Sequence, residues 1–148
     1  MNSAENVFLT VNSIAFFCWI FLFVFYEKTW IYKALFSFVM VGLALTYAFF
    51  ITQALTGESQ GGFDTLGNLK LLFEDDLAVL AGWIHYLVFD LFVGMWICRD
   101  STRQNIGRWW ILPCLIFTFM MGPVGLLLYF IIRASKSGKY LQDPFSAG

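Results

Sequence analysis

Four long apolar runs constrain this chain more than any other feature of its sequence. They cover approximately residues 7–26, 34–55, 77–98 and 109–132. Each has about 20 residues or slightly more, enough for a helix to cross a hydrocarbon core about 30 Å thick. Because a backbone in lipid must satisfy its own hydrogen bonds, the runs are predicted to be helices. They show none of the alternation of a membrane β-strand. We therefore predict an all-α fold, a bundle of four transmembrane helices.

The composition supports a membrane protein and argues against a soluble domain. Of the 148 residues, 59% are apolar, 20% are aromatic and 13% are charged, whereas a soluble domain carries about 25% charged residues. We expect membrane lipid as a partner. The net charge of −1 gives no case for a nucleic acid. Cys18, Cys98 and Cys114 have no metal-binding or disulfide spacing, so we expect no metal and no cofactor.

The connections suggest a single membrane domain over residues 1–148. The turns at 27–33 and 99–108 are short, so the helices that they join are expected to be antiparallel neighbours. The loop at 56–76 is longer and polar. It carries apolar residues at near-helical spacing, so it is either an amphipathic segment in the membrane interface or an ordinary loop. These residues are Phe63, Leu66, Leu69, Leu72 and Phe73. The tail at 133–148 is expected to be flexible.

The basic residues give little information on orientation. One side of the membrane carries Lys28, Lys33, Arg99, Arg103 and Arg108. The other side carries Lys70, Arg133, Lys136 and Lys139. Five against four favours both termini outside the cytoplasm by the positive-inside rule, but it does not fix the orientation.

The third run places two ionisable residues, His85 and Asp90, close to its middle. An aspartate at that depth costs about 2.5–3.5 kcal/mol on insertion scales, and such residues face the protein interior and mark functional sites. Tyr86 shares a helix face with Asp90, whereas His85 lies about 140° from Asp90 around the axis. His85 and Asp90 therefore either flank one cavity or face different neighbours. We take His85, Asp90 and Tyr86 as candidate catalytic residues for acid–base chemistry.

A structural role for Asp90 is the alternative. Its carboxyl group could bond a polar side chain and hold two helices together. The candidate partners are Tyr86, Asn12, Thr46, Gln53 and Thr118.

The fourth run contains Gly122-Pro123-Val124-Gly125 at its middle. Pro123 removes a backbone donor and clashes with the carbonyl of Phe119, which predicts a kink at about the depth of His85 and Asp90. Such a kink either serves packing alone or opens a pocket. We expect the pocket to be lined by Phe117, Phe119, Trp83 and Trp96. The candidate substrate-binding residues are Trp83, Phe89, Trp96, Phe119 and Pro123.

Charged residues flank the third run at both ends. Glu74, Asp75 and Asp76 precede it, and we expect Asp75 or Asp76 to cap the helix. The surplus carboxylates could hold a divalent cation, but no further ligands are close in sequence, so no metal is predicted. Arg99 and Asp100 close the run at the interface, where a solvated or headgroup-binding role is expected.

The third and fourth runs together resemble a known family. They contain the motif Gly82-Trp83-x-His85-Tyr86-x-x-Phe89-Asp90-Leu91-Phe92-x-Gly94-x-Trp96, then Asp100, and then Gly122-Pro123-x-Gly125. This pattern resembles the abscisic-acid-deficient-four family, small four-helix membrane proteins of plants, algae and bacteria. The first two runs match that family by hydropathy only.

The resemblance implies a function in carotenoid chemistry, because the plant family is required to make neoxanthin from violaxanthin. It implies an isomerase in which an acid protonates an epoxide oxygen while a base removes a proton from the polyene. Asp90 and His85 match these roles, with Tyr86 as an orienting donor. The substrate would be a hydrophobic, carotenoid-like molecule that enters from the bilayer.

Three functions stay open at this point. The chain is a carotenoid or isoprenoid isomerase, a non-enzymatic carotenoid- or lipid-binding protein that assists a partner enzyme, or a small transporter. Transport would require a homo-oligomer, since four short helices leave little room for a pathway. No presequence rich in Arg and Ser is present, so we expect a multi-pass protein of a bacterial inner membrane. The resemblance places plant relatives in a plastid membrane.

Overall fold

The computed structural model describes residues 3–57 and 61–138, and all the regular structure in these ranges is helical. This confirms the predicted all-α class. The elements are α1 (Ser3–Phe25), α2 (Thr29–Ala34), the π-helical segment η1 (Leu35–Met40), α3 (Val41–Thr56), α4 (Leu66–Leu72), α5 (Asp76–Arg103), α6 (Arg108–Met121) and α7 (Pro123–Ser137).

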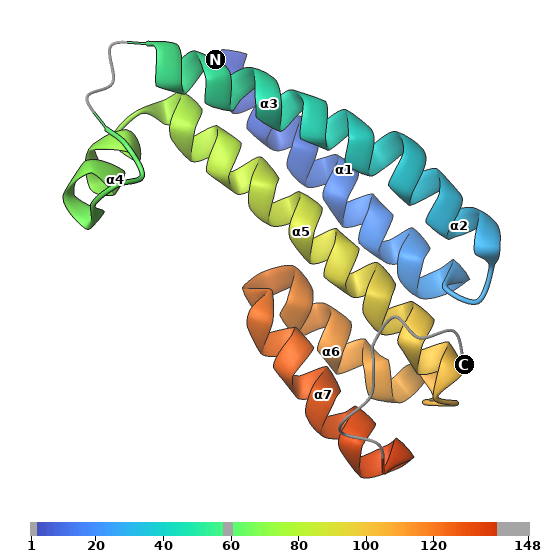
Figure 1. Cartoon of the computed structure of the whole chain (residues 1–148). Helices are drawn as coiled ribbons and strands as arrows, with labels where there is room; N and C mark the ends of the chain where they lie inside the picture. Colours follow the sequence, from blue (N-terminus) through green and yellow to red (C-terminus); the bar gives the residue numbers. More distant parts are fainter. Residues whose placement is uncertain (1–2, 58–60, 139–148) are drawn as a thin grey trace.

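Within the described ranges, three helical segments are long and apolar enough to cross a membrane. They are Ala4–Phe25 in α1, the continuous run Thr29–Thr56 through α2, η1 and α3, and Asp76–Arg103 in α5. The second begins about one turn before the predicted start at residue 34. Helix α5 packs against both α1 and α3 and is therefore the centre of the bundle (Figure 1).

The fourth apolar run does not cross the bundle as one kinked helix. Helix α6 ends at Met121, and α7 starts at Pro123 and returns beside α6 toward the end where α6 began (Figure 1). Between them Gly122 has a φ of +44°, which glycine adopts without the steric cost that other residues pay. We call residues 108–137 the re-entrant hairpin. This finding corrects the prediction of a spanning helix over 109–132.

Gly125 explains how the two arms of the re-entrant hairpin can lie so close together. A Cβ atom at Gly125 would lie 2.1 Å from the backbone nitrogen of Thr118 and 2.4 Å from the carbonyl oxygen of Cys114. The backbones of α6 and α7 are thus in direct contact, as small residues permit between membrane helices.

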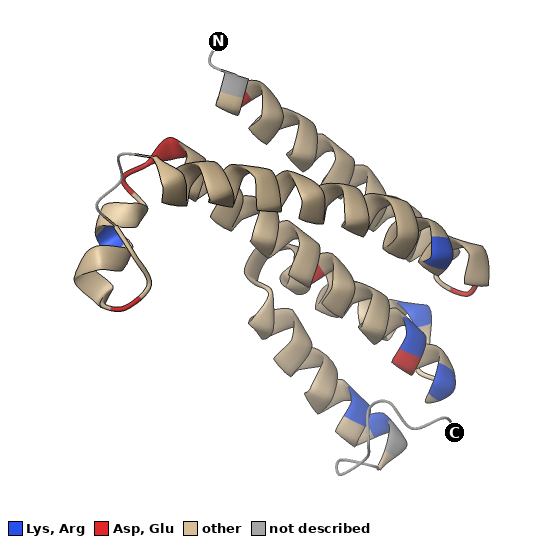
Figure 2. Ribbon diagram, turned by 45° about the horizontal axis from the view of Figure 1, so that its top comes forward, with Lys and Arg blue, Asp and Glu red and all other residues tan. Residues whose placement is uncertain are grey.

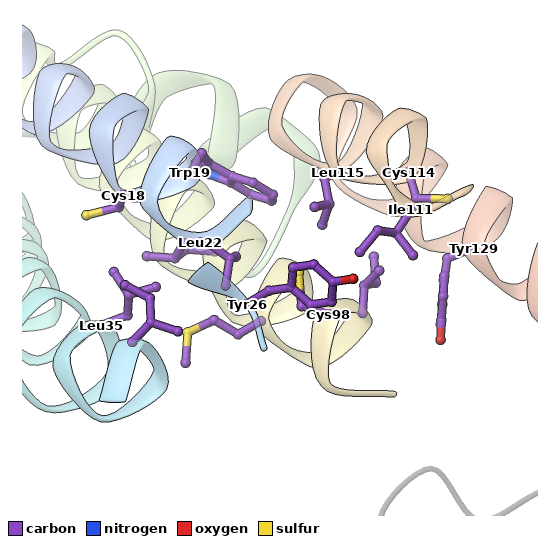
Figure 3. Close-up of a cluster of buried hydrophobic side chains, with 14 of the residues drawn as sticks. Cys18, Trp19, Leu22, Tyr26, Leu35, Cys98, Ile111, Cys114, Leu115 and Tyr129 are labelled. Atoms are coloured by element: carbon purple, nitrogen blue, oxygen red, sulfur yellow. The ribbon is translucent and has the colours of Figure 1, made fainter. Parts of the chain in front are cut away.

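The main core forms where α1, α5 and the re-entrant hairpin meet, with the start of the second span on its other side (Figure 3). Leu22 of α1 and Cys98 of α5 are fully buried in it. Trp19 fits against α5 because Gly94 leaves room for its ring: a Cβ at Gly94 would lie 2.5 Å from Trp19 Cη2. All three cysteines are buried free thiols, and buried cysteines of this kind pack as small apolar residues.

The loop between α3 and α5 contains the short helix α4, which lies against the outer ends of both neighbours. The Thr65 hydroxyl caps α4 by accepting a 3.1 Å hydrogen bond from the Asn68 amide. Leu72 is buried against Ala54 and Ala78, whereas Leu66 is exposed. The described part of the loop therefore contains a short helix with a buried side, whereas its location in the membrane interface stays a prediction. Residues 58–60 of the loop, and 139–148 of the tail expected to be flexible, lie outside the described residues; residues 133–137 of that tail belong to α7.

Because α7 turns back, the basic residues gather at one end of the molecule (Figure 2). Among the described residues this end carries Lys28, Lys33, Arg99, Arg103, Arg108, Arg133 and Lys136. The opposite end, which holds the start of α1 and the α4 loop, carries Lys70 and most of the acidic residues. The expected division of five against four is therefore corrected to seven against one among the described residues, and Lys139 lies outside them. The start of α1 and the end of α7 lie at opposite ends of the molecule, contrary to the expectation that both termini share a side.

Candidate functional site

Asp90 is buried in the middle of α5, with 7% of its surface exposed. Within the described part of the chain its Oδ2 atom has no hydrogen-bond partner. The hydroxyls of Thr46 and Thr118 donate to carbonyls of their own helices, and the Asn12 side chain pairs with Trp83. These three side chains are therefore engaged elsewhere. A buried polar atom without a partner is rare in proteins and calls for an explanation.

The turn of the re-entrant hairpin lies directly against Asp90. A Cβ atom at Gly122 would lie 2.6 Å from Asp90 Oδ1. Position 122 thus requires glycine for two reasons, its positive φ and the proximity of this carboxyl group. The hairpin brings the point where the backbone reverses to the middle of α5.

Tyr86 joins the same site from one helical turn earlier on α5. Its hydroxyl donates a 2.8 Å hydrogen bond to the carbonyl oxygen of Phe119, and it lies beside the Asp90 carboxyl group. In a continuous helix that carbonyl would accept from residue 123, but Pro123 has no N–H. Tyr86 therefore satisfies the acceptor that the proline frees. We call Tyr86, Asp90, Phe119 and Gly122 the hairpin-tip site.

His85 lies on a different face of α5 from Asp90. Its ring stacks on Phe89 at 4.5 Å and meets Tyr47 of α3 edge-on at 5.6 Å. It lines a pocket of about 270 Å³ between α3, α5 and the α4 loop, to which Phe63 and Phe73 contribute. Of the two alternatives left open by the sequence, His85 and Asp90 thus face different neighbours.

The candidate substrate-binding residues do not form one pocket. The Trp83 indole nitrogen donates to Asn12 Oδ1 at 3.0 Å, and its ring lies 5.3 Å from that of Tyr86. Trp96 is further along α5, edge-on to Tyr129 at 5.7 Å. The remaining candidates, Phe89 and Pro123, and also Phe117, are exposed. The residues of the predicted pocket are therefore divided: Trp83 and Trp96 have different neighbours, and Phe119 lines a groove to which Phe117, Trp83 and Trp96 do not contribute.

A groove that the sequence did not reveal runs between α1 and α6. It has a volume of about 240 Å³ and is lined by Phe16, Trp19, Ile20, Phe23, Leu112, Leu115, Ile116, Phe119 and Met120. Trp19 packs edge-on against Phe119 at 5.7 Å. Its indole Nε1 is buried and, like Asp90 Oδ2, has no partner among the described residues. Nothing in the spacing of the apolar residues in the first run distinguished Trp19 from its neighbours.

Asp100 corrects the expectation of a solvated or headgroup-binding role. Its side chain is buried, and its Oδ2 atom accepts 2.7 Å hydrogen bonds from Arg133 Nε and from the Tyr129 hydroxyl. We call these three residues the Asp100 clasp. The expectation failed because α7 returns to the end of α5 and brings Arg133 to Asp100. Arg99 is exposed as expected, with its guanidinium 5.9 Å from the centre of the Tyr32 ring.

The acidic residues before α5 act mainly on that helix. Asp75 Oδ1 accepts from the backbone nitrogens of Leu77 at 2.8 Å and Ala78 at 3.0 Å, which confirms the expected cap. Asp76 lies in the first turn, where a negative charge is favourable, and Glu74 is exposed. Within residues 3–57 and 61–138 no cluster of three His, Cys, Asp or Glu side chains is placed to hold a metal ion.

Outside the membrane-spanning segments, one carboxyl group is clearly perturbed. The side-chain amide of Asn68 donates to Asp64 Oδ1 at 2.9 Å and to Oδ2 at 3.1 Å. These hydrogen bonds favour the ionised form and lower the pKa of Asp64 below its usual value. Asp64 is fully exposed in the loop before α4, so this effect is local to the loop.

Comparison with known proteins identifies one family and one relative. The family described as ABA DEFICIENT 4-like matches residues 6–129, a range that contains the hairpin-tip site, His85 and the α1–α6 groove. The chain is similar to "Protein ABA DEFICIENT 4, chloroplastic" of Arabidopsis thaliana, with 25% identity over 109 residues. That match covers 70% of this chain and 48% of the relative, so the chain spans about half the length of the relative. No solved structure matches.

Proposed function

Because this chain belongs to the ABA DEFICIENT 4-like family, we propose that it acts on an oxygenated carotenoid or a related isoprenoid as an isomerase that opens an epoxide. The resemblance described above implies a role in neoxanthin synthesis for the plant members of this family, and the Arabidopsis relative bears the name ABA DEFICIENT 4. The observation that carries the proposal is the unpartnered, buried carboxyl oxygen of Asp90 at the hairpin-tip site. We place this chain in a bacterial inner membrane, and the plant relative is chloroplastic.

Asp90 suits the acid of such a reaction because of its surroundings. Its carboxyl group lies among apolar helices beside Gly122, where a neutral acid is easier to accommodate than a carboxylate. In the proposed step Asp90 gives its proton to the epoxide oxygen, and the carbon–oxygen bond breaks. A proton then leaves the neighbouring polyene carbon, and its electron pair completes an allene. The atoms balance as an isomerisation, with no cofactor.

The structure separates His85 from this reacting centre, which changes the assignment of roles. His85 faces Tyr47 and the pocket behind the α4 loop, and Asp90 faces the re-entrant hairpin. We therefore assign the role of base to Asp90 as well: after it has given up its proton, its carboxylate takes the proton that leaves the polyene carbon. Tyr86 orients the Asp90 carboxyl group. His85 contributes to binding at its own pocket.

The test is pigment analysis in cells that make violaxanthin. We expect expression of the chain to yield a new isomer by chromatography, and Asp90→Asn to abolish it, because the amide cannot supply the proton. Asp64→Asn, which changes an exposed carboxyl group in the loop, is the matched control and should keep full activity. His85→Ala should reduce product severalfold without abolishing it. Undiminished product from Asp90→Asn would refute the proposal.

A non-enzymatic pigment-binding role is the second candidate, and the apolar groove between α1 and α6 favours it. In that case unchanged pigment would co-purify with the protein, and no new isomer would form. Asp90→Asn would then alter the amount of bound pigment but not its identity.

A further inference from the structure

We propose that the groove between α1 and α6 holds the polyene chain of the ligand, and that Trp19 in its wall and Asp90 behind that wall on α5 hold an oxygen atom on that chain. The class of ligand rests on the proposed function, whereas the location of the ligand rests on the structure alone. This location differs from that of the pocket behind the α4 loop, which His85 lines.

The groove is suited to a rod-shaped apolar molecule that comes from the bilayer. Every side chain that lines it is apolar, and four of them also have large exposed surfaces on the outside of the bundle: Phe16, Ile20, Ile116 and Met120. Its inner wall is made of Trp19 and Leu115, which lie across from each other between α1 and α6 (Figure 3). A lipid-soluble chain can therefore enter from the side without crossing water.

Two buried polar atoms near the inner wall of the groove lack partners in the described residues. One is Nε1 of Trp19, which lines the groove, and the other is Oδ2 of Asp90, which lies behind that wall on α5. Both belong to one neighbourhood, because the Trp19 ring touches Gly94, one turn after Asp90. An indole N–H is a donor only, and a carboxyl group can donate or accept. A hydroxyl or epoxide oxygen on the ligand would satisfy both, and leaving both unmet is costly in the absence of water.

Aromatic rings continue this path beyond the hairpin tip. Phe119 packs against Trp19 at 5.7 Å, and its carbonyl holds Tyr86. The Tyr86 ring lies 5.3 Å from Trp83, and Trp83 lies 5.7 Å from Phe8 of α1. This row of rings lies between α5 and α1 and extends toward the end of the bundle where α1 and α5 begin. An extended polyene could therefore lie with one part in the groove and the other part along these rings, with Asp90 between the two parts.

The first test fills the groove. Ile116→Trp places a large ring where half-exposed Ile116 lines the groove, and Ile131→Trp makes the same change at a similarly exposed position on α7. Binding of violaxanthin to the purified protein in detergent is measured by quenching of tryptophan fluorescence, with each variant referenced to its own unliganded spectrum. We expect at least about tenfold weaker binding for Ile116→Trp, the effect of losing 1.4 kcal/mol, and unchanged binding for Ile131→Trp. Equal binding by both variants would overturn the proposal, as would a wild-type protein that binds no violaxanthin.

The second test asks whether the inner wall recognises an oxygen atom. Trp19→Phe keeps an aromatic ring against Gly94 and Phe119 but removes the N–H donor. We expect it to weaken violaxanthin binding about tenfold, as the loss of one buried hydrogen bond implies, and to leave binding of the hydrocarbon β-carotene unchanged. An equal loss for both pigments would refute the polar part of the site. Equal wild-type affinity for both pigments and for a phospholipid acyl chain would show a plain lipid groove instead.

Failure of this inference can be separated from failure of the proposed function. If violaxanthin binds in the groove but the wild-type protein forms no new isomer, the proposed isomerase fails and the groove assignment stands. If Ile116→Trp binds and converts violaxanthin like the wild type, the groove assignment fails and the isomerase stands.

Discussion

Single residues show how the re-entrant hairpin is attached to α5. In the Asp100 clasp, one carboxyl oxygen accepts from both Arg133 and Tyr129, and all three side chains are buried. A buried ion pair of this kind need not be more stable than an apolar pair, but removal of one partner leaves an uncompensated charge. The clasp therefore fixes the position of α7, and through α7 it fixes the hairpin tip beside Asp90.

Arg133→Met tests this attachment. We expect the free energy of unfolding in detergent to fall by about 3–5 kcal/mol, because Asp100 would keep a buried and unpaired charge. Thermal unfolding followed by circular dichroism measures the change. The control is Arg103→Met at an exposed position near the end of α5, which should change stability little. If the two variants unfold at the same temperature, Arg133 does not hold the hairpin.

The sequence predicted single residues well where their partners are local. The cap at Asp75 follows from a carboxylate placed before an apolar run, and it is present. The buried state of Asp100 was not predictable in this way, because its partners lie 29 and 33 residues later. They reach Asp100 only because the chain reverses at Gly122.

At the scale of elements, the re-entrant hairpin depends on two glycines that perform different functions. Gly122 provides the positive φ of the turn and contacts Asp90, whereas Gly125 lets α7 lie directly on the backbone of α6. Alanine at either position would place a Cβ atom within 2.6 Å of existing atoms. Only a shift of the hairpin arms or of Asp90 could relieve such contacts.

Gly122→Ala and Gly125→Ala should therefore destabilise the hairpin, the former by at least the 1–3 kcal/mol that a strained backbone costs, as a rough estimate. Gly42→Ala in α3 is the matched control, because a Cβ there meets nothing within 4 Å and alanine favours a helix by about 1 kcal/mol. Urea or thermal unfolding in detergent gives the comparison. Stability of Gly125→Ala equal to that of Gly42→Ala would contradict the close contact of α6 and α7.

The sequence predicted the spanning helices more reliably than the hairpin, for a physical reason. Hydropathy reports whether a segment lies in lipid, and it gave three spans within a few residues of their bounds. It does not report direction, so a run of 24 residues over 109–132 looks the same whether it crosses or turns back. The motif Gly122-Pro123-Val124-Gly125 did mark the correct position, but a proline predicts a kink equally well, and the reversal depends on φ at Gly122 and on contacts with α5.

At the scale of the whole molecule, the reversal changes the distribution of charge. Seven described basic residues lie at the end that holds the α1–α2 turn, the α5–α6 turn and the end of α7, and Lys70 lies at the other (Figure 2). From the positive-inside rule we predict that the basic end lies in the cytoplasm. In that orientation the α4 loop and the pocket with His85 would face the opposite side of the membrane, with Asp90 between the two surfaces.

Labelling of single cysteines with a membrane-impermeant maleimide tests both the orientation and the reversal. The background replaces the three buried cysteines by serine or alanine, and the probes are Leu66→Cys in α4, Thr29→Cys at the start of α2 and Ser135→Cys near the end of α7, all at exposed positions. In intact bacterial cells we expect labelling of Leu66→Cys alone, because the other two positions lie at the basic end. After permeabilisation all three should react.

The probe in α7 is decisive for the fold, since a fourth spanning helix would place residue 135 on the same side as residue 66. Labelling of Ser135→Cys together with Leu66→Cys in intact cells would therefore contradict the re-entrant hairpin, and with it the contact between Gly122 and Asp90 on which the proposed site is built.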